Sequence, residues 1–389
     1  KEFGNILQNH RYEAQRDRYG RTAFLLAVQS GSPEMAQACL MAGADLEERD
    51  RRGKTALMHA AARGDGSLTA WLIERGAAVD AVDKEGYTAL MDACARDARH
   101  TVRMLLVAGA GITMENNYKE QAVKVAVSPE TIKLLIEHGA DWNDADVEQR
   151  RALTGLPVDY DPQVTRKEYT AGKHRRFGRR NPEVMDIPFW QEMVKSGISA
   201  TRARMLYHDK HWWMPRSGKA VWCYERFGQS ITLLADGRIV EIGGEHEDAY
   251  DPEFCIYNDV VVFDGKGAFT IYGYPEAVFP PTDFHSATLV GEYIYLIGSL
   301  GYQGERHYGE TPVYRLDTST FVMQRMHTTG DKPGWISSHR AKLVDDHSVL
   351  ITGGKVCRLE EDIGEYLENT ELFVLDLEQM KWRRETGSS

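Results

Sequence analysis

Residues 50–77 read DRRGKTALMHAAARGDGSLTAWLIERGA, and this stretch decides the fold of the first third of the chain. Its opening turn, Asp50-x-x-Gly53, precedes Thr55, which is placed to cap a helix with small residues on one face. A second apolar stripe at helical spacing follows. The stretch ends at Gly76, because glycine readily adopts the left-handed conformation that terminates helices. The sequence therefore predicts a turn followed by two helices.

The same signals recur at a fixed interval. Copies of the turn begin at Asp17, Asp50 and Asp83, which lie 33 residues apart, and a shortened, degenerate copy ends near Asp141. Fixed periods of this length are typical of stacked units that bury their surfaces against one another. The pattern resembles ankyrin repeats, although the Thr-Pro-Leu-His motif of that family has lost its proline and its histidine in every copy.

In the ankyrin family, the residues that contact partners lie on the turn tips and on the inner helix face. The resemblance implies a basic secondary binding surface with two tyrosines on this chain. By position, its residues are Arg18, Tyr19, Arg21, Arg51, Arg52, Lys54, Arg63, Lys84, Glu85, Tyr87 and Arg96. One interpretation is that these are solvated turn residues. The other is a surface for an anionic ligand, either an acidic partner or an acidic part of the same chain.

The last third of the chain carries a different repeat. Gly243-Gly244, Gly298-Ser299 and Gly353-Gly354 lie 55 residues apart, and each pair follows an alternating run that predicts a β-strand. Each period holds four such runs and a late aromatic residue. This order resembles the kelch blades of a β-propeller, from about Gly228 to Glu385.

These patterns predict an α + β multidomain fold. An ankyrin-repeat α-solenoid is expected over residues 1–141, a basic linker with a helical, tryptophan-rich connector over 142–220, and antiparallel kelch-like blades over 221–389. A closed propeller needs at least four blades, and three are legible, so the blades are predicted to form an open partial propeller. Its free blade face needs a cover, which the ankyrin stack, the middle segment, a partner or a second copy could provide.

The loops that follow the glycine pairs supply the main candidate site. The loops of neighbouring blades emerge on one side, so the acidic first and third loops are expected to face the same way, with a mixed aromatic loop between them. The residues that we expect to bind a partner are Glu245, Glu247, Asp248, Asp251, Glu253, Tyr302, Arg306, Tyr308, Glu360, Glu361, Asp362 and Glu365. Such a surface suits a basic protein. The alternative is a pair of solvated loops, since neither cluster has the ligand spacing of a calcium loop.

The composition narrows the function further. A net charge of -11 argues against nonspecific nucleic-acid binding by the whole surface, so a protein partner is expected. The chain has no run of 18 apolar residues that would span a membrane. Its five cysteines contain no CxxC pair, which suits reduced, buried thiols in a cytoplasm. His208 and His211 have no third metal ligand in register, so neither a metal nor a cofactor is expected. The oligomeric state stays open.

No catalytic motif is present, and the leading hypothesis is a non-catalytic protein-binding protein. Compact, acidic cytoplasmic proteins with degenerate ankyrin repeats resemble immunity proteins that are paired with bacterial toxins. That resemblance implies acidic loops that cover the basic cleft of a nuclease-type toxin. One alternative is an ankyrin and kelch scaffold or effector that recruits another protein. Another is a kelch-type enzyme or a carbohydrate binder, which would need polar residues that converge in a pocket.

Overall fold

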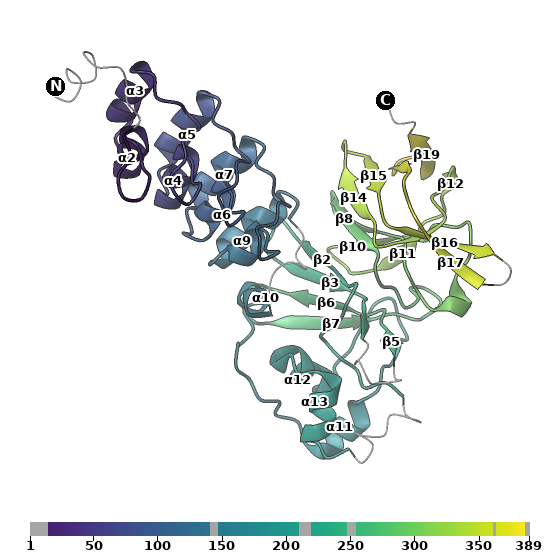
Figure 1. The fold of residues 1–389 in the computed structure, drawn as a ribbon. Helices are drawn as coiled ribbons and strands as arrows, with labels where there is room; N and C mark the ends of the chain where they lie inside the picture. Colours follow the sequence, from purple (N-terminus) through teal and green to yellow (C-terminus); the bar gives the residue numbers. More distant parts are fainter. Residues whose placement is uncertain (1–14, 141–146, 210–218, 247–253, 361–362, 386–389) are drawn as a thin grey trace. The chain divides into compact units, whose positions relative to one another are not determined.

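The computed structural model describes residues 15–140, 147–209, 219–246, 254–360 and 363–385. The chain forms two compact units, Lys1–Leu153 and Thr154–Ser389. The first, which we call the helical unit, consists of short helices, and the second, the sheet unit, is built mainly of antiparallel sheets (Figure 1). Over the described residues these sheets do not close into a barrel. The predicted α + β multidomain fold is confirmed.

The helical unit repeats a turn followed by two helices, as the sequence predicts. Its helices are α2 (Ala23–Ser30), α3 (Pro33–Met41), α4 (Ala56–Arg63), α5 (Gly66–Glu74), α6 (Ala89–Cys94), α7 (Arg99–Val107), α8 (Ala122–Val125), α9 (Pro129–Glu137) and α10 (Val147–Thr154). The first helices of successive pairs, α2, α4, α6 and α8, pack against one another in order. The side chains of Thr22, Thr55 and Thr88 each accept a hydrogen bond from the backbone N–H three residues later. The predicted caps are therefore confirmed.

Small residues let the inner helices approach closely. Ala56, Ala60 and Ala61 of α4 are fully buried, and Ala89 and Ala93 of α6 match them. A larger side chain at these positions would overfill the packed interface between neighbouring repeats. The fourth pair is shortened, because α8 ends after a single turn where the backbone of Ala126 becomes extended.

The sheet unit contains three sheets with the same four-strand order. Blade 1 consists of β2 (Ser230–Leu233), β3 (Ile239–Ile242), β6 (Val260–Phe263) and β7 (Phe269–Gly273); blade 2 of β8 (Ser286–Val290), β9 (Tyr293–Ile297), β10 (Val313–Asp317) and β11 (Met323–Arg325); blade 3 of β14 (Arg340–Leu343), β15 (Ser348–Thr352), β18 (Leu372–Asp376) and β19 (Lys381–Glu385). Within each blade, neighbouring strands are antiparallel. The three predicted blades are thus present.

Short strands extend these blades. At the outer edges, β1 (Glu183–Val184) pairs with β7 of blade 1, and β12 (Thr329–Gly330) runs parallel to β19 of blade 3. Two further sheets stand apart from the blades: β4 (Glu245–His246) with β5 (Cys255–Ile256), and β13 (Trp335–Ser337) with β16 (Lys355–Glu360) and β17 (Ile363–Glu368).

Blade 2 is buried on both faces. One face packs on blade 1 through a cluster that includes Val240, Val262 and Leu296. The other packs on blade 3 through a cluster that includes Ile297, Phe373 and Trp382. Successive side chains of a strand point to opposite faces of its sheet, so one strand of blade 2 contributes to both clusters.

The middle segment covers the face of blade 1 that lies away from blade 2. It contains α11 (Arg166–Gly172), α12 (Pro188–Ser196) and α13 (Ala200–Leu206). The rings of Trp190 and Trp222 stack with centroids 4.7 Å apart, and the Trp222 indole N–H donates to Asp259 over 2.8 Å. The Tyr224 hydroxyl donates to Glu241 over 3.2 Å, and its ring contacts that of Phe263. The contacts with blade 1 come from Trp222 and Tyr224, which lie just beyond the predicted end of the middle segment at residue 220.

The prediction that the cysteines are buried thiols is confirmed, because all five are buried and free. Burial raises the pKa of the Cys94 thiol to about 12. A thiol with so high a pKa is almost entirely protonated at neutral pH, and the thiolate is the reactive form. Among the described residues, none of the helices has the length and apolar character needed to cross a membrane.

Candidate functional site

The turn tips of the helical unit form a regular row. The residues at its tips, which we call the turn-tip row, are Arg18, Tyr19, Arg51, Arg52, Lys84, Glu85, Asn117 and Tyr118. In every repeat, one polar side chain shapes the turn by accepting two backbone hydrogen bonds. Asp50, for example, accepts from the N–H groups of Arg52 (2.8 Å) and Lys54 (3.0 Å). Side chains of this kind favour such turns because they hydrogen-bond the backbone two residues on.

Backbone hydrogen bonds join each tip to the next. The N–H of Arg51 donates to the carbonyl of Tyr19, and the N–H of Lys84 donates to that of Arg52, both over 2.9 Å. The same bond links Asn117 to Glu85. Each bond joins the first tip residue of one repeat to the second tip residue of the repeat before it, so the row is held in register along the stack.

The fourth tip was missed in the sequence. Asn116 lies 33 residues after Asp83 and shapes the turn in the same way, accepting from Tyr118 over 2.9 Å and from Glu120 over 3.0 Å. Lys119 takes the place of the usual glycine with a φ of 64°. Only the 33-residue spacing could have revealed this turn in the sequence, because an asparagine here accepts the backbone hydrogen bonds that an aspartate accepts in the other repeats.

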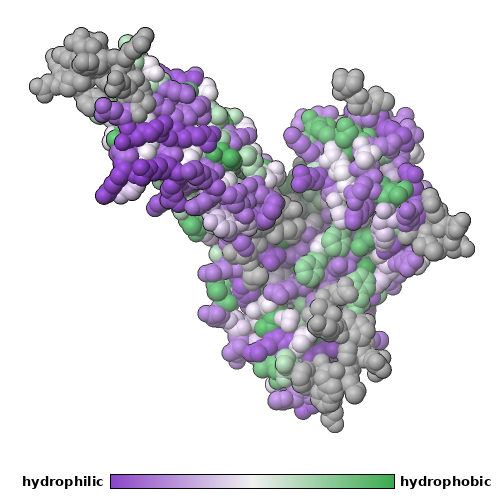
Figure 2. All heavy atoms as spheres, in the orientation of Figure 1, coloured by the Kyte–Doolittle hydropathy of each residue, from purple (hydrophilic) through white to green (hydrophobic). Residues whose placement is uncertain are grey.

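The tips are basic and exposed. The side chains of Arg18, Arg51 and Lys84 are exposed, and none forms an ion pair with another described residue. Arg52 meets Glu85 at 3.4 Å, and both side chains are largely exposed. The flank of the unit that carries α2, α4 and α6 is strongly hydrophilic (Figure 2). Three unpaired cations at equivalent repeat positions therefore give the row a positive charge.

Other residues predicted for this surface are bound within the fold. Arg21 forms an ion pair with Asp17 at 2.6 Å and lowers the pKa of that carboxyl to about 2. Lys54 lies 2.6 Å from Asp92 in a half-buried pair. Burial raises the pKa of the Tyr87 hydroxyl. These side chains stabilise the stack and offer little to a partner.

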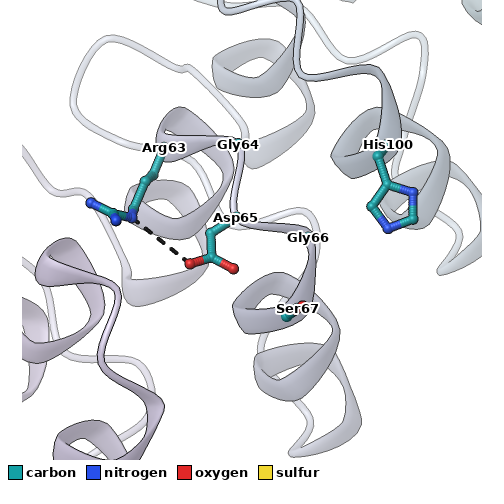
Figure 3. A pocket seen from close by; sticks show the side chains of 6 residues that line it. All are labelled: Arg63, Gly64, Asp65, Gly66, Ser67 and His100. Atoms are coloured by element: carbon teal, nitrogen blue, oxygen red, sulfur yellow. Dashed lines mark ion pairs between the residues drawn. The ribbon is translucent and has the colours of Figure 1, made fainter.

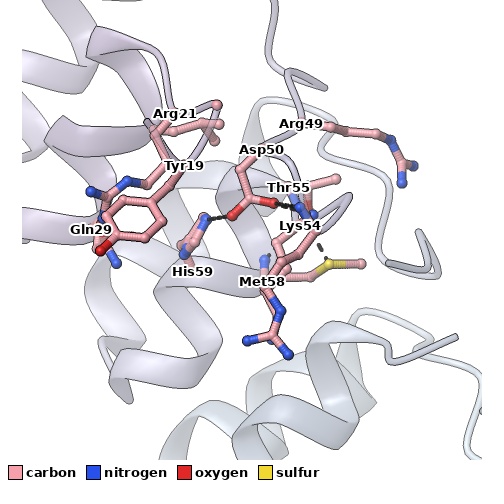
Figure 4. A network of polar contacts seen from close by, with 12 residues as sticks. Tyr19, Arg21, Gln29, Arg49, Asp50, Lys54, Thr55, Met58 and His59 are labelled. Atoms are coloured by element: carbon pink, nitrogen blue, oxygen red, sulfur yellow. Dashed lines mark hydrogen bonds and ion pairs between the residues drawn. The ribbon is translucent and has the colours of Figure 1, made fainter. Parts of the chain in front are cut away.

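A histidine that follows the helix cap belongs to the same polar network. Figure 4 shows His59 directed at Asp50, whose carboxylate lies 3.1 Å from its Nε2. Burial lowers the pKa of His59 in spite of the opposing effect of Asp50. The imidazole therefore holds the turn of its own repeat.

A shallow pocket of about 530 Å³ lies beside the second repeat (Figure 3). It is lined by Arg63, Gly64, Asp65, Gly66, Ser67 and His100. Asp65 already caps α5 by accepting from Leu68 over 3.0 Å, and it lies 3.8 Å from Arg63. Arg63 was predicted to bind a partner, and Arg96, the remaining predicted position, is exposed on the next repeat. Asp65 and Arg63 are therefore engaged within the fold. Among the residues that line the pocket, no nucleophile is hydrogen-bonded to a base.

The predicted acidic loops lie largely outside the described residues. This holds for Glu247, Asp248, Asp251, Glu253, Glu361 and Asp362, and for the side chain of Glu360. Glu245 is described in β4, where it is half-buried, and Glu365 is exposed on β17. Glu245 lies close to the buried Asp283, and burial raises the pKa of that carboxyl.

The second loop is tied into the fold. The hydroxyl of Tyr302 accepts from the N–H of Ile256 over 2.8 Å, and the ring is half-buried. Arg306 donates to the carbonyls of Leu300 (2.9 Å) and Gly301 (3.0 Å). Tyr308 is half-buried. Tyr302 and Arg306 therefore hold this loop in place through contacts within the chain itself.

Part of the basic middle stretch is also structural. Arg175 donates to the carbonyl of Ile256, and Arg176 lies 3.0 Å from Glu183. A buried ion pair that the sequence did not reveal joins Arg226 to Asp259, and the guanidinium lies 3.7 Å from the centroid of the Tyr257 ring. Among the described residues, no group of three or more metal-binding side chains is placed to hold an ion.

Comparisons with known proteins agree with the two repeat types. Residues 24–116 and 57–146 match the family model of ankyrin repeats in three copies. Kelch domain-containing protein 3 of Homo sapiens is 26% identical over 153 residues, which cover 39% of this chain and 36% of that protein. The ankyrin repeat domain of Bcl-3, described as a unique member of the IkappaB protein family, is 32% identical with a TM-score of 0.29, covering 30% of this chain and 51% of that one.

The chain therefore spans about a third of the human relative and about half of the solved ankyrin domain. Ankyrin repeats are present in the N-terminal part, and the kelch likeness is weak. Modules of both kinds are generally non-catalytic and serve protein interactions, so the coarse prediction of a protein-interaction scaffold is supported.

Proposed function

We propose that the chain is a non-catalytic scaffold whose turn-tip row binds an acidic segment of a partner protein. The observation that carries this proposal is the row of Arg18, Arg51 and Lys84, three exposed cations at equivalent positions of successive repeats that have no ion-pair partner among the described residues. Opposite charges along a fixed spacing favour both encounter and register. The exposed tyrosines at the two ends of the row suit a partner interface, in which this residue type is enriched.

A labelled oligoglutamate peptide tests the proposal by fluorescence anisotropy. Reversing two charges in Arg51→Glu/Lys84→Glu is expected to weaken binding about tenfold or more, and binding to the native chain is expected to weaken as salt rises. The matched control is Arg103→Glu, which reverses an exposed charge on the outer helix α7. If the control weakens binding as much as the double variant, or if the native chain does not bind the peptide, the proposal is wrong.

The acidic loops favour a second, more specific role. In this candidate, the chain is an immunity protein that covers the basic cleft of a nuclease-type toxin with its first and third loops. The supporting observations are the crowding of carboxylates in both loops and the exposure of Glu365 and Glu368 on β17. A basic partner and an acidic partner would thus use different units of the chain.

Inhibition of a panel of basic nucleases separates the two candidates. The second candidate predicts stoichiometric inhibition of one nuclease, which is lost when Glu247, Asp248, Glu361 and Asp362 are replaced by lysine. Inhibition that survives these substitutions would contradict the second candidate. Inhibition that is lost when only Arg51 and Lys84 are changed would instead assign the activity to the turn-tip row.

A further inference from the structure

A second pocket, of about 220 Å³, lies within the sheet unit. Pro280 and Pro281, from the segment that leads from blade 1 to blade 2, line it together with Trp335 of β13. Pockets for drug-sized ligands usually measure roughly 300–1,000 Å³. This pocket therefore suits a compact molecule with an apolar part.

The apolar lining is held in place by hydrogen bonds within the unit. Beside Pro280, the carbonyl of Phe279 accepts from the side-chain amide of Asn258 over 2.6 Å. The indole N–H of Trp335 donates to the carbonyl of Leu300 over 3.0 Å, so Trp335 offers the pocket apolar ring surface only. A preformed lining loses little conformational freedom when a ligand binds.

A hydroxyl and a guanidinium line the same pocket. Tyr314 of β10 lies directly opposite Arg325 of β11, and opposed residues of antiparallel strands place their side chains on one face. Tyr314 is only 5% exposed, and its hydroxyl has no hydrogen-bond partner among the described residues. Arg325 is exposed and has no ion pair within the described ranges. Buried polar groups are normally hydrogen-bonded, so these two donors are available to an acceptor such as a carboxylate.

The equivalent positions of the other two blades lack this pair of donors. The second residue of the third blade strand is Tyr314 in blade 2, whereas blade 1 has Val261, opposite Ile271. Blade 3 has Phe373, opposite Arg384, and that guanidinium pairs with Glu371 at 2.8 Å. The blade architecture therefore does not require a hydroxyl beside an unpaired arginine.

Two carboxylates complete the lining. Glu276 and Glu305 are exposed, and neither forms an ion pair with a residue that the structure describes. The carboxylates would repel a purely anionic ligand, and Arg325 would repel a purely cationic one. A ligand that carries both charges avoids both penalties.

We propose that this pocket binds a free α-amino acid with an apolar side chain. The carboxylate of the ligand accepts from Arg325 and Tyr314, and its ammonium group lies toward Glu276 and Glu305. The apolar side chain packs against Trp335 and the two prolines. An apolar lining with a few placed polar groups is the usual composition of a small-molecule site.

Isothermal titration calorimetry of the full chain tests the proposal. The probes are phenylalanine and leucine, together with phenethylamine, which lacks the carboxylate of phenylalanine, and hydrocinnamate, which lacks its ammonium group. Phenylalanine is expected to bind at least about tenfold more tightly than either analogue, because each analogue leaves charged groups of the pocket unpaired.

The decisive variant is Arg325→Met. It should weaken phenylalanine and hydrocinnamate about tenfold or more without weakening phenethylamine, a selective loss that a folding defect would not produce. Tyr314→Phe should give a smaller loss of the same kind. Arg384→Met, at the equivalent position of blade 3, is the matched control and should leave all affinities unchanged. The proposal is overturned if neither amino acid binds, if both analogues bind as tightly as phenylalanine, or if Arg325→Met and Arg384→Met have equal effects.

Discussion

The two repeat arrays join their neighbours by different means. In the helical unit, each tip is linked to the next by a backbone bond in an exposed turn, such as that from Lys84 to Arg52. In the sheet unit, neighbouring blades share large apolar clusters. At each of the two junctions between blades, which we call seams, a buried histidine also lies within hydrogen-bond distance of a serine hydroxyl of the preceding blade, such as His285 with Ser230. The difference indicates that contacts in the helical unit are local and contribute to stability additively. In the sheet unit, a substitution at one seam should instead destabilise the whole apolar cluster that two blades share.

The largest effect should come from substituting Gly298, which lies against a backbone carbonyl at the seam between blades 2 and 3. Gly298→Ala places a Cβ 2.3 Å from a backbone oxygen at a φ of 77°, so the free energy of unfolding should fall by about 3–5 kcal/mol. Gly353→Ala has a φ of 62° but no close contact, and should cost only about 1–2 kcal/mol. Urea denaturation followed by tryptophan fluorescence measures both. Equal losses of stability would contradict the difference in packing around Gly298 and Gly353.

Acidification should weaken the junctions between the blades of the sheet unit. Burial lowers the pKa of His285 to about 3 and that of His339 to about 4, well below the ordinary value near 6.5. The unfolded chain therefore takes up protons below pH 6.5 that the folded chain does not, so stability falls as pH falls. Each imidazole should cost about 2 kcal/mol between pH 7 and pH 5.

The control for this effect is His339→Gln, which stays neutral. The pH dependence of its free energy of unfolding between pH 7 and pH 5 should be smaller than that of the native chain by one imidazole. A variant with an unchanged slope would show that His339 is not held neutral at the seam.

In the helical unit, a half-buried ion pair should matter more than an exposed one. Lys54→Met leaves Asp92 without its cation, and since burial already raises the pKa of Asp92, the free energy of unfolding should fall by about 1.5 kcal/mol. Arg52→Gln breaks the exposed contact with Glu85 and should cost less than about 0.5 kcal/mol. Denaturation of the two variants compares them, and an equal cost would contradict the local account of this unit.

The smallest of the four effects is the loss of a helix cap. Thr55→Ala removes the oxygen that accepts from Met58, which should lower the free energy of unfolding by about 1 kcal/mol. Thr55→Ser keeps that oxygen and serves as the control. If both variants are equally destabilised, the methyl group rather than the cap is what stabilises this turn.

Much of the architecture could be predicted, because repeats expose their own period. The spacing of Asp17, Asp50 and Asp83 gave the turns and caps of the helical unit, and the spacing of the glycine pairs gave three blades. The candidate site was harder to predict, since exposure depends on partners that lie far away in the sequence. Lys54 was predicted to bind a partner, yet it pairs with Asp92, 38 residues later.

The sequence by itself determined where each repeat begins and which residues shape its turns, since those interactions span only a few residues. Tertiary structure alone decided which cations stay unpaired and which glycines lie against the backbone of a neighbouring blade. Lys54 and Lys84 look alike in the sequence, but Lys54 lies 2.6 Å from Asp92, which is 38 residues later, whereas Lys84 has no ion pair among the described residues. The same holds for Gly298 and Gly353, because only packing places a carbonyl oxygen against the first.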